Sequence, residues 1–322
     1  MNYILNVDTL EFRGSSKVHL NDYLTGSIYK FPNGLFLDRI YDYSQLKQTY
    51  PFCFKIKDPY NDIGVLYTKS FDLSLESGLN ITIRIDNHIF YGGNLNYYLD
   101  KIVEALTINR TLIKRLDISY DTDFDVMSSF RTLFYDKSTE FKLRNKITVI
   151  GTGKDDREIH VGRLGSKCIS IYNKTKELQH SQKNHIMNLH QKVFGFTNIY
   201  RVELRLMHRL PDIKNINLLN LGYQTYLETI MGTYFDTLIQ FVDIGSGKKI
   251  DFITLNNTGQ KIPKVTKIRG QGQGGEIKTA KMVINFMDKE IKGSGKVKDW
   301  KGIRETLLKK YELDTWYKMK GK

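Results

Sequence analysis

Four short segments of this sequence carry reactive side chains where a purely structural strand would carry inert polar ones. They are residues 115–121, 158–163, 169–174 and 200–205. Between them they hold carboxylates, one imidazole, arginines and a tyrosine. These groups could together perform metal-assisted phosphodiester chemistry with a tyrosine nucleophile.

The spacing of the reactive residues predicts that they share faces of strands. Successive side chains of a strand point to opposite faces, so residues two apart lie together. The groups expected to share a face are Asp117, Ser119 and Asp121, then Glu158 and His160, then Arg201, Glu203 and Arg205. If the strands are neighbours in one sheet, these side chains meet on one surface.

A divalent cation would withdraw charge from the scissile phosphate in such a site. Mg²⁺ and Mn²⁺ accept oxygen ligands, sometimes with one imidazole. The predicted ligands are Asp117, Glu203 and His160, with Asp121 as a fourth. Asp121 stands beside Thr122 and Asp123 at a strand end, so a turn cap explains it equally well.

Tyr172 is the predicted nucleophile. The chain has 20 tyrosines, and the structural alternative for this one is a half-buried aromatic residue of a sheet. Its context favours function, because Ser170 shares its strand face and a polar run follows it. Lys174 could lower the phenol pKa or contact a phosphate, and Arg163 could do the latter.

The elements that position these groups indicate an α+β fold. Residues 1–90 contain short β-branched and aromatic runs between turn signals, and the run 88–91 predicts a strand. Apolar spacing predicts helices over 95–112 and 125–134. We therefore expect an antiparallel catalytic sheet with helices on one face, followed by a basic, mainly helical C-terminal region.

Three parts are expected along the chain. They are a β-rich N-terminal part at 1–93, a catalytic core at 94–212 and a helical, basic DNA-binding region at 213–322. Within the last part, the pattern predicts a long helix over 216–242 and a strand over 251–255.

The end of the chain predicts a linker and a basic helix. The glycine-rich run 269–275 lacks the Gly-Lys-Ser/Thr ending of a P-loop, which favours a linker. A helix over 297–313 would set basic residues off its apolar face. The predicted DNA-binding residues are Arg201, Arg205, Lys298, Lys301, Arg304 and Lys309.

The net charge of +14 is concentrated toward the C-terminus. Residues 259–322 hold 17 Lys and Arg against seven Asp and Glu. A polyphosphate backbone selects such a surface, because each neutralised phosphate releases counterions. The alternative is a lysine-rich genome that places lysine on any surface.

Cysteine and histidine usage gives no metal or disulfide framework. Cys53 and Cys168 make neither a disulfide pattern nor a zinc-finger spacing. His180, His185 and His190 are five residues apart, which fits neither a helical pair nor strand alternation and indicates a solvated helix. Without a signal peptide or an apolar membrane span, a reducing cytoplasm is expected.

Four motifs resemble the Rep_trans family of plasmid rolling-circle replication initiators, and are similar also to replication proteins of filamentous phages. They are Arg-Leu-Asp-Ile-Ser-Tyr-Asp at 115–121, Ile-His-Val-Gly-Arg-Leu-Gly-Ser at 159–166, Ile-Ser-Ile-Tyr-Asn-Lys-Thr-Lys-Glu at 169–177 and Arg-Val-Glu-Leu-Arg-Leu at 201–206. The stretch 7–12 is like the strand that opens such proteins.

The resemblance implies a nicking and closing endonuclease, distantly akin to the HUH nucleases. Its tyrosine, here Tyr172, would stay attached to the 5′ phosphate while the 3′ hydroxyl primes synthesis. The family acids fall on Asp117 and Glu203. The family's His-hydrophobic-His pair is absent, with Glu158 and His160 in a comparable place. The implied partners are single- and double-stranded origin DNA, a host helicase and polymerase, and a second copy of the chain.

Two other functions fit parts of the sequence. His160 and Arg163 match the His-x-x-Arg box of tyrosine recombinases, although that family sets the box in a helix and this segment predicts a strand. The protein could also be a catalytically silent DNA-binding regulator, in which the acids pair with Arg115, Arg201 and Arg205 across strands. Metal-dependent cleavage of single-stranded DNA would separate the nuclease from this regulator.

Overall fold

The chain forms two compact units, Met1–Lys264 and Val265–Lys322. The computed structural model describes residues 3–18, 20, 28–41, 50–70, 73, 78–142, 147–152, 155–181, 184–256, 261–263, 305–306 and 308–309. The predicted linker at 269–275 lies outside these residues, as do Lys298, Lys301 and Arg304 and most of the predicted last helix.

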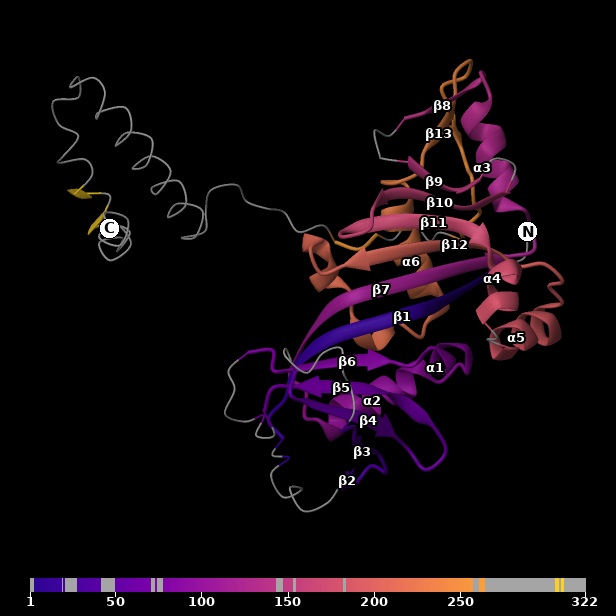
Figure 1. Ribbon diagram of the computed structural model, residues 1–322. Coiled ribbons are helices and arrows are strands. Elements are labelled where there is room, and N and C mark those ends of the chain that lie inside the picture. Colours follow the sequence, from indigo (N-terminus) through magenta and orange to yellow (C-terminus); the bar gives the residue numbers. More distant parts are fainter. Residues whose placement is uncertain are drawn as a thin grey trace. The chain divides into compact units, whose positions relative to one another are not determined.

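A large antiparallel sheet organises the first unit (Figure 1). In the described residues it has eleven strands, in the order β2-β3-β4-β5-β6-β1-β7-β12-β11-β10-β9. The strands are β1 (Tyr3–Ser15), β2 (Ile28–Lys30), β3 (Phe36–Arg39), β4 (Phe52–Lys57), β5 (Asp62–Thr68), β6 (Ile81–Ile85), β7 (Arg110–Thr122), β9 (Ile147–Thr152), β10 (Asp155–Arg163), β11 (Lys167–Asn173) and β12 (Tyr200–Met207). The two longest of these, β1 and β7, pair at the centre.

Helices and a small second sheet complete this unit. The helices are α1 (Asn87–Tyr91), α2 (Leu95–Ala105), α3 (Val126–Tyr135), α4 (Lys174–Ser181), α5 (Asn184–Phe194), α6 (Gln224–Phe235) and the 3₁₀ helices η2 (Pro211–Asn215) and η3 (Leu218–Asn220). The small sheet has the order β14 (Lys249–Ile250), β13 (Phe241–Asp243) and β8 (Thr139–Phe141). None of the helices described is long and apolar enough to cross a membrane. The predicted α+β class is confirmed.

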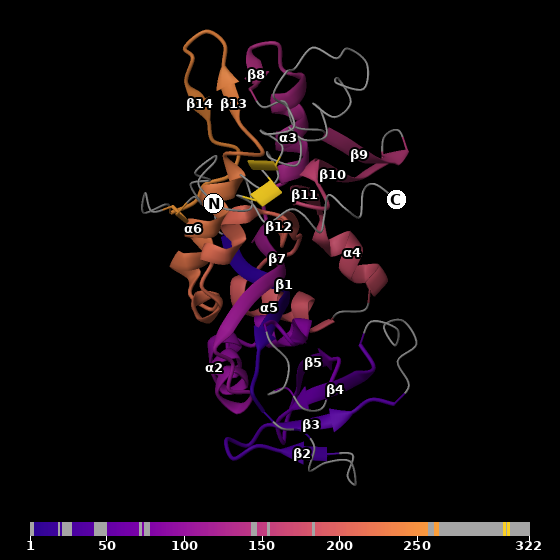
Figure 2. The ribbon, with the colours of Figure 1, turned by 90° about the vertical axis from the view of Figure 1, so that its left-hand side faces the viewer.

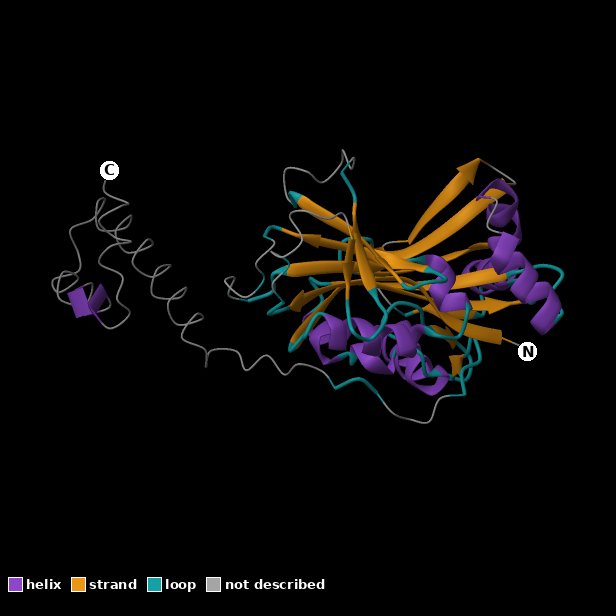
Figure 3. Cartoon of the chain, turned by 90° about the horizontal axis from the view of Figure 1, so that it is seen from below, coloured by secondary structure: helices purple, strands orange, loops and turns teal. Residues whose placement is uncertain are grey.

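Strand alternation gives the large sheet one apolar and one polar face. Leu116, Ile118 and Tyr120 of β7 are buried on the apolar side, together with Val202 and Leu204 of β12. Helix α6 packs on β1 and β12, and α3 packs on β11 and β12. Figure 2 shows α6 and α2 on one side of the strands and α4 on the other, and Figure 3 shows a helical layer beneath the sheet. The opposite face carries the charged side chains.

Four predicted elements differ from the structure. The helix predicted over 95–112 ends at Ala105, and residues 110–112 belong to β7. Residues 88–91 belong to helix α1 rather than to a strand, because Ile89, Phe90 and Tyr91 are all buried together, without the alternation of a strand. The long helix predicted over 216–242 is shorter. Residues 218–220 form η3, the backbone N–H of Gly222 donates to Asn96 Oδ1 at 2.7 Å, and α6 covers only Gln224–Phe235. Residues 251–255 contain bends and no strand pairing.

The compact unit extends across the predicted part boundaries at 93 and 212. Strand β1 pairs with β6 on one side and β7 on the other, and α6 packs on β1. Residues of all three expected parts therefore share one core, and the first unit ends only at Lys264.

Candidate functional site

The register of four strands sets the reactive side chains in rows across the polar face. The rows are Glu158, Tyr172, Arg201 and Asp121; then His160, Ser170, Glu203 and Ser119; then Gly162, Cys168, Arg205 and Asp117. Antiparallel pairing places residues directly opposite one another, and period-two alternation turns every second one to this face. The structure thus gathers the four sequence segments on one surface.

Tyr172 and Glu203 form the central pair of this surface. The Tyr172 hydroxyl donates a hydrogen bond to Glu203 Oε2 at 3.0 Å. Burial raises the pKa of Glu203, and the negative charges of Asp8 and Asp117 raise it further. Burial also raises the pKa of Tyr172 well above its ordinary value, opposed by the charge of Arg201. Glu203 is therefore a carboxylate of increased basicity in contact with a phenol that needs a base.

Arg201 lies fully buried beside this pair. Its Nε and Nη2 donate to the two carboxylate oxygens of Asp121 at 2.6 and 2.7 Å, and Nη1 donates to Asp8 Oδ1 at 2.7 Å. Nη2 also donates to the Tyr91 hydroxyl at 2.8 Å. Burial alone would lower the pKa of Arg201, but Asp121, Tyr91 and Asp8 hold it well above its ordinary value. A permanent positive charge is thus held next to Tyr172, its cross-strand neighbour.

His190 anchors helix α5 to the same network. Its Nε2 lies 2.8 Å from Asp121 Oδ2, and its Nδ1 lies 2.8 Å from the Ile186 carbonyl oxygen. The side chain is buried, so the predicted solvated helix is wrong at this position. Ile186 and His190 are one turn apart on the face of α5 that is buried, which the five-residue spacing of the histidines could not reveal.

Asp8 is a residue of the site that the sequence did not single out. It stands at an irregularity of β1, between Val7 and Thr9, where the pairing with β7 shifts by one residue. Its carboxylate accepts hydrogen bonds from Arg201 and from the Tyr91 hydroxyl, the latter at 2.8 Å. Burial raises the pKa of Asp8, but the charges of Arg201 and Lys174 outweigh this and hold it well below its ordinary value. The resemblance of the stretch 7–12 to the opening strand of the family was the one signal, and it did not assign Asp8 a role.

Arginines neutralise Asp117 and Glu203, which lie in the third and second of these rows. Asp117 accepts hydrogen bonds from Arg115 and, at 3.2 Å, from Arg205 Nε. Arg205 Nη2 also donates to Glu203 Oε1 at 3.1 Å. Arg205 therefore bridges Asp117 and Glu203, and keeps a quarter of its side chain exposed on the polar face.

The four predicted metal ligands, Asp117, Glu203, His160 and Asp121, do not converge on one point. Asp117 and Asp121 are four residues apart in β7, about 13 Å between Cα atoms. His160 Nδ1 lies 2.8 Å from Ser170 Oγ, and guanidinium groups occupy the space between the carboxylates. Within the described part of the chain, no three His, Cys, Asp or Glu side chains are placed to hold a metal ion. These residues as arranged do not fit a divalent cation.

The two other predicted catalytic residues lie in different places. Lys174 is buried next to Tyr172, with Nζ 5.8 Å from the ring centroid, and is ion-paired with Glu177. Burial and the charge of Arg201 lower the pKa of Lys174. Arg163 lies five residues from Glu158 along β10, about 16 Å away, on the opposite face and exposed. Arg163 is therefore not part of this site.

The predicted DNA-binding residues that the structure describes differ in their exposure. Arg201 has no exposed side-chain surface, so it cannot contact DNA as predicted. It holds the Asp8 and Asp121 carboxylates inside the site instead. Arg205 is partly exposed and remains available. Lys309 is exposed in the second unit. The His-x-x-Arg box lies in strand β10, which removes the structural basis for the recombinase alternative.

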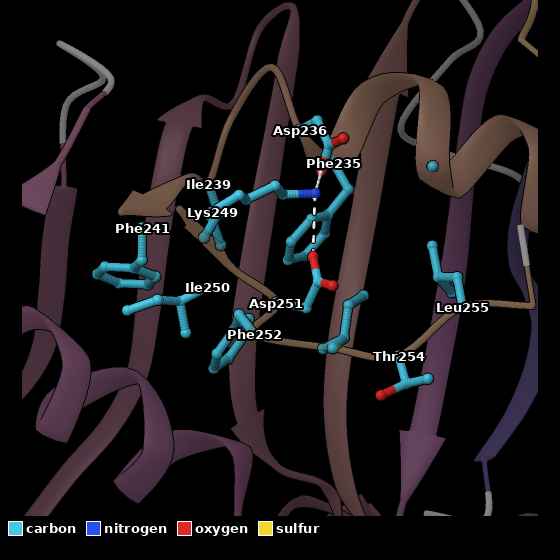
Figure 4. Close-up of a pocket in the computed structure, with 12 residues that line it drawn as sticks. Phe235, Asp236, Ile239, Phe241, Lys249, Ile250, Asp251, Phe252, Thr254 and Leu255 are labelled. Carbon is cyan, nitrogen blue, oxygen red and sulfur yellow. Dashed lines mark hydrogen bonds and ion pairs between the residues drawn. The ribbon is translucent and has the colours of Figure 1, made fainter. Parts of the chain in front are cut away.

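A cavity of about 240 Å³ lies away from these groups, between α6 and the β13–β14 hairpin (Figure 4). Phe235, Phe252 and neighbouring apolar side chains line it. Lys249 Nζ spans its edge, 2.8 Å from Asp236 Oδ1 and 3.2 Å from Asp251 Oδ1. The cavity contains no side chain of the polar face and offers no catalytic arrangement.

Comparison with known proteins finds little similarity in sequence. No model of a known protein family matches the chain, and no curated protein matches it. Among solved structures, a rolling circle replication initiator protein from Geobacillus stearothermophilus aligns with a TM-score of 0.41 and 12% sequence identity. The alignment covers 82% of this chain and 93% of that one. The geometry of the polar face therefore carries the functional argument.

Proposed function

We propose that this protein cleaves one strand of DNA by transesterification, with Tyr172 as the nucleophile. The observation that carries the proposal is the hydrogen bond from the Tyr172 hydroxyl to Glu203, a buried carboxylate with a raised pKa. A tyrosine becomes a nucleophile when an adjacent base takes its proton. Arg201 and Lys174 then stabilise the phenolate by their positive charge.

The reaction follows from these contacts. Glu203 Oε2 accepts the phenol proton, and the phenolate oxygen forms a bond to the scissile phosphorus. The bond from phosphorus to the 3′ oxygen breaks, and that oxygen takes a proton from water and leaves as a 3′ hydroxyl. Arg205, which bridges Glu203 and Asp117 and keeps a quarter of its side chain exposed, meets the phosphate on the polar face. The 5′ phosphate stays on Tyr172.

Initiation of rolling-circle replication is the biological role we propose for this reaction. A covalent 5′ phosphotyrosine with a free 3′ hydroxyl supplies a primer and retains the strand for later closure. The second unit supports DNA binding, with 15 Lys and Arg against seven Asp and Glu in residues 265–322. Binding of origin DNA, recruitment of a host helicase and polymerase, and dimerisation remain part of the proposal. A requirement for Mg²⁺ or Mn²⁺ stays a separate prediction, because the four predicted ligands do not fit a cation as arranged and no step above depends on one.

The test is capture of the covalent product. The full chain is incubated with 3′-labelled single-stranded oligonucleotides of random sequence, with Mn²⁺, with Mg²⁺ or with EDTA, and analysed on denaturing gels. Wild type should retain label on the protein, and Tyr172→Phe should retain none. Tyr3→Phe is the matched control, because the Tyr3 hydroxyl donates to buried Glu228 at 2.7 Å in a similar pair outside the site.

The outcomes separate the possible functions. Adduct in Tyr172→Phe would move the nucleophile to another tyrosine. Absence of adduct in every cation condition would favour the silent DNA-binding regulator. That alternative has its own support, because Asp117 and Asp121 are paired with arginines as it predicts.

A further inference from the structure

A second cavity, of about 280 Å³, opens beside the polar face where β6 leads into α1. We call it the β6 pocket. Arg84, Asp86 and Asn87 line it from β6 and the start of α1, and Asp8 and Arg115 line it from β1 and β7. Asp8 belongs to both sites, since its carboxylate also binds Arg201. The pocket is thus continuous with the surface that carries Tyr172.

Strand register shows the same continuity. Arg84 of β6 lies opposite Glu11 of β1, and Glu11 lies opposite Arg115 of β7. Arg115 in turn binds Asp117, the partner of Arg205. Four strand spacings separate β6 from β11, or about 19 Å across the sheet, and the row of Arg115 lies six residues along β7 from the row of Tyr172, or about 20 Å. The pocket and the nucleophile therefore lie at two places on the polar face that one DNA strand can span.

Most charges around the pocket are already neutralised. Asp8 pairs with Arg201, Glu11 with Lys114, and Arg115 with Asp117. Arg84 is exposed and forms no hydrogen bond or ion pair within the described residues. Its guanidinium is the donor that the pocket leaves for a ligand.

The pocket also leaves one acceptor for a ligand. Asp86 precedes α1 without making a side-chain cap hydrogen bond. Asn87 Nδ2 donates to the Asp8 carbonyl oxygen at 2.9 Å, and Asn87 Oδ1 is buried beyond the reach of a ligand. The free groups at the pocket surface are thus the Arg84 guanidinium and the Asp86 carboxylate, two residues apart.

This set complements the edges of guanine. Guanine offers O6 and N7 as acceptors, the usual target of arginine, and N1–H and N2–H₂ as donors. A carboxylate can take N1–H and N2–H together. Thymine offers one N–H, and cytosine and adenine offer one amino group each, so they would leave one oxygen of the Asp86 carboxylate unpaired. Unstacked bases of single strands are commonly read in this way.

We propose that the β6 pocket binds one unstacked guanine of the DNA strand that Tyr172 cleaves. Arg84 donates to O6 and N7, and Asp86 accepts from N1 and N2. The proposal rests on the proposed function for the identity of the strand. It adds a sequence preference that the groups around Tyr172 do not provide.

The experiment measures binding without chemistry. Full-length Tyr172→Phe in EDTA is titrated into fluorescein-labelled dT15 and into the same oligonucleotide with one central guanine, and anisotropy is recorded. A bidentate base contact is worth about 1–3 kcal/mol, so guanine should tighten binding by about 5- to 150-fold. When Arg84→Gln or Asp86→Asn is combined with Tyr172→Phe, the two oligonucleotides should bind with equal affinity.

Two controls sharpen the experiment. Arg13→Gln removes the same charge from exposed Arg13 of β1, which donates to the Leu79 carbonyl oxygen at 3.0 Å outside the pocket. This variant should weaken the binding of both oligonucleotides equally and leave the ratio of their affinities unchanged. Inosine in place of guanine lacks the N2 amino group, so it should bind less tightly than guanine, and Asp86→Asn should abolish this difference.

The results distinguish this inference from the proposed function. Equal binding of the two oligonucleotides, no binding of either, or a preference that survives Arg84→Gln and Asp86→Asn would overturn the pocket's role. A stronger preference for adenine, cytosine or thymine at the central position would also overturn it. Adduct formation by wild type without a guanine preference rejects the pocket alone. A guanine preference without adduct rejects the tyrosine chemistry and leaves the pocket standing.

Discussion

The most consequential contact at the residue scale joins Tyr172 to Glu203. A carboxylate with an ordinary pKa is a weak base for a phenol. Burial and the adjacent Asp8 and Asp117 charges raise the pKa of Glu203, which improves the match between base and nucleophile. Asp117 and Asp8 therefore act on the phenol through Glu203.

We expect Glu203→Gln to slow adduct formation by about 10²- to 10⁴-fold, the usual contribution of a general base. The base must be ionised, so the wild-type rate should rise with pH through the raised pKa of Glu203, and this rise should be absent in the variant. Single-turnover rates of adduct formation between pH 4 and 9 provide the measurement.

Glu228→Gln is the matched control for this prediction, because Glu228 is also buried and accepts a tyrosine hydroxyl hydrogen bond. It should keep both the rate and the pH dependence of wild type. A Glu203→Gln rate within a few-fold of wild type would mean that another group takes the proton.

Arg201 carries the second residue-scale prediction, which concerns stability. Arg201→Met leaves Asp121 and Asp8 buried without their shared partner, and we expect a loss of about 3–5 kcal/mol in the free energy of unfolding. Urea denaturation measures this loss. Arg13→Met, at an exposed position, should change stability by no more than about 0.5 kcal/mol.

The ion pair of Asp121 and Arg201 also predicts how stability depends on pH. Burial opposes ionisation of Asp121, but Arg201 and His190 hold its pKa below the ordinary value. The unfolded chain therefore binds this proton more readily, so the stabilisation exists above the ordinary carboxyl pKa and is lost as the pH falls below it. A wild-type acid transition identical to that of Arg201→Met would contradict this assignment.

At the scale of elements, the β10–β11 hairpin presents both His160 and Tyr172 on the polar face. Gly162 of β10 has φ +109°, and a Cβ there would lie 2.7 Å from the Lys167 carbonyl oxygen and 2.8 Å from Leu238 Cδ2. The close approach of the two strands, and of the segment after α6, thus requires glycine at this position.

We expect Gly162→Ala to destabilise the protein by about 1–3 kcal/mol, since both the backbone conformation and the space disfavour a side chain. Thermal or urea unfolding measures the change. Gly165→Ala in the adjoining turn is the control, because its nearest contact would be Arg209 Nη1 at 3.7 Å. Equal stabilities of the two variants would show that the hairpin tolerates a shift at Gly162.

In the whole molecule, the reactive side chains and the largest excess of positive charge belong to different units. All described groups of the polar face belong to Met1–Lys264, whereas residues 265–322 carry a large excess of Lys and Arg. Phosphate contacts made by the second unit would strengthen binding without sequence preference and would make it depend on salt.

A protein of residues 1–264 should therefore still form the Tyr172 adduct but bind single-stranded DNA with a shallower salt dependence. Each lost phosphate contact should reduce the slope of log K against log salt concentration by about 0.7. Anisotropy titrations between 50 and 300 mM NaCl measure the slope. An unchanged slope would assign the phosphate contacts to the first unit.

Sequence patterns were sufficient to predict the α+β class and which side chains share a strand face, because alternation with period two is a local property of each strand. The sequence therefore indicated Asp117, Tyr172, Glu203 and His160 as neighbours on one surface. It also indicated that Asp117 and Asp121 could be paired with arginines, as they are.

Which of these side chains are in contact depends on the packing of distant segments, and sequence patterns could not predict it. Register depends on pairing between distant segments, and it placed Tyr172 against Glu203 rather than beside Arg163. The irregularity at Asp8 and the burial of Arg201 and His190 arise where β1, α1 and α5 meet β7 and β12, which no local pattern contains. The predicted metal ligands were separated for the same reason, because charge pairing is settled by the three-dimensional neighbours of each carboxylate.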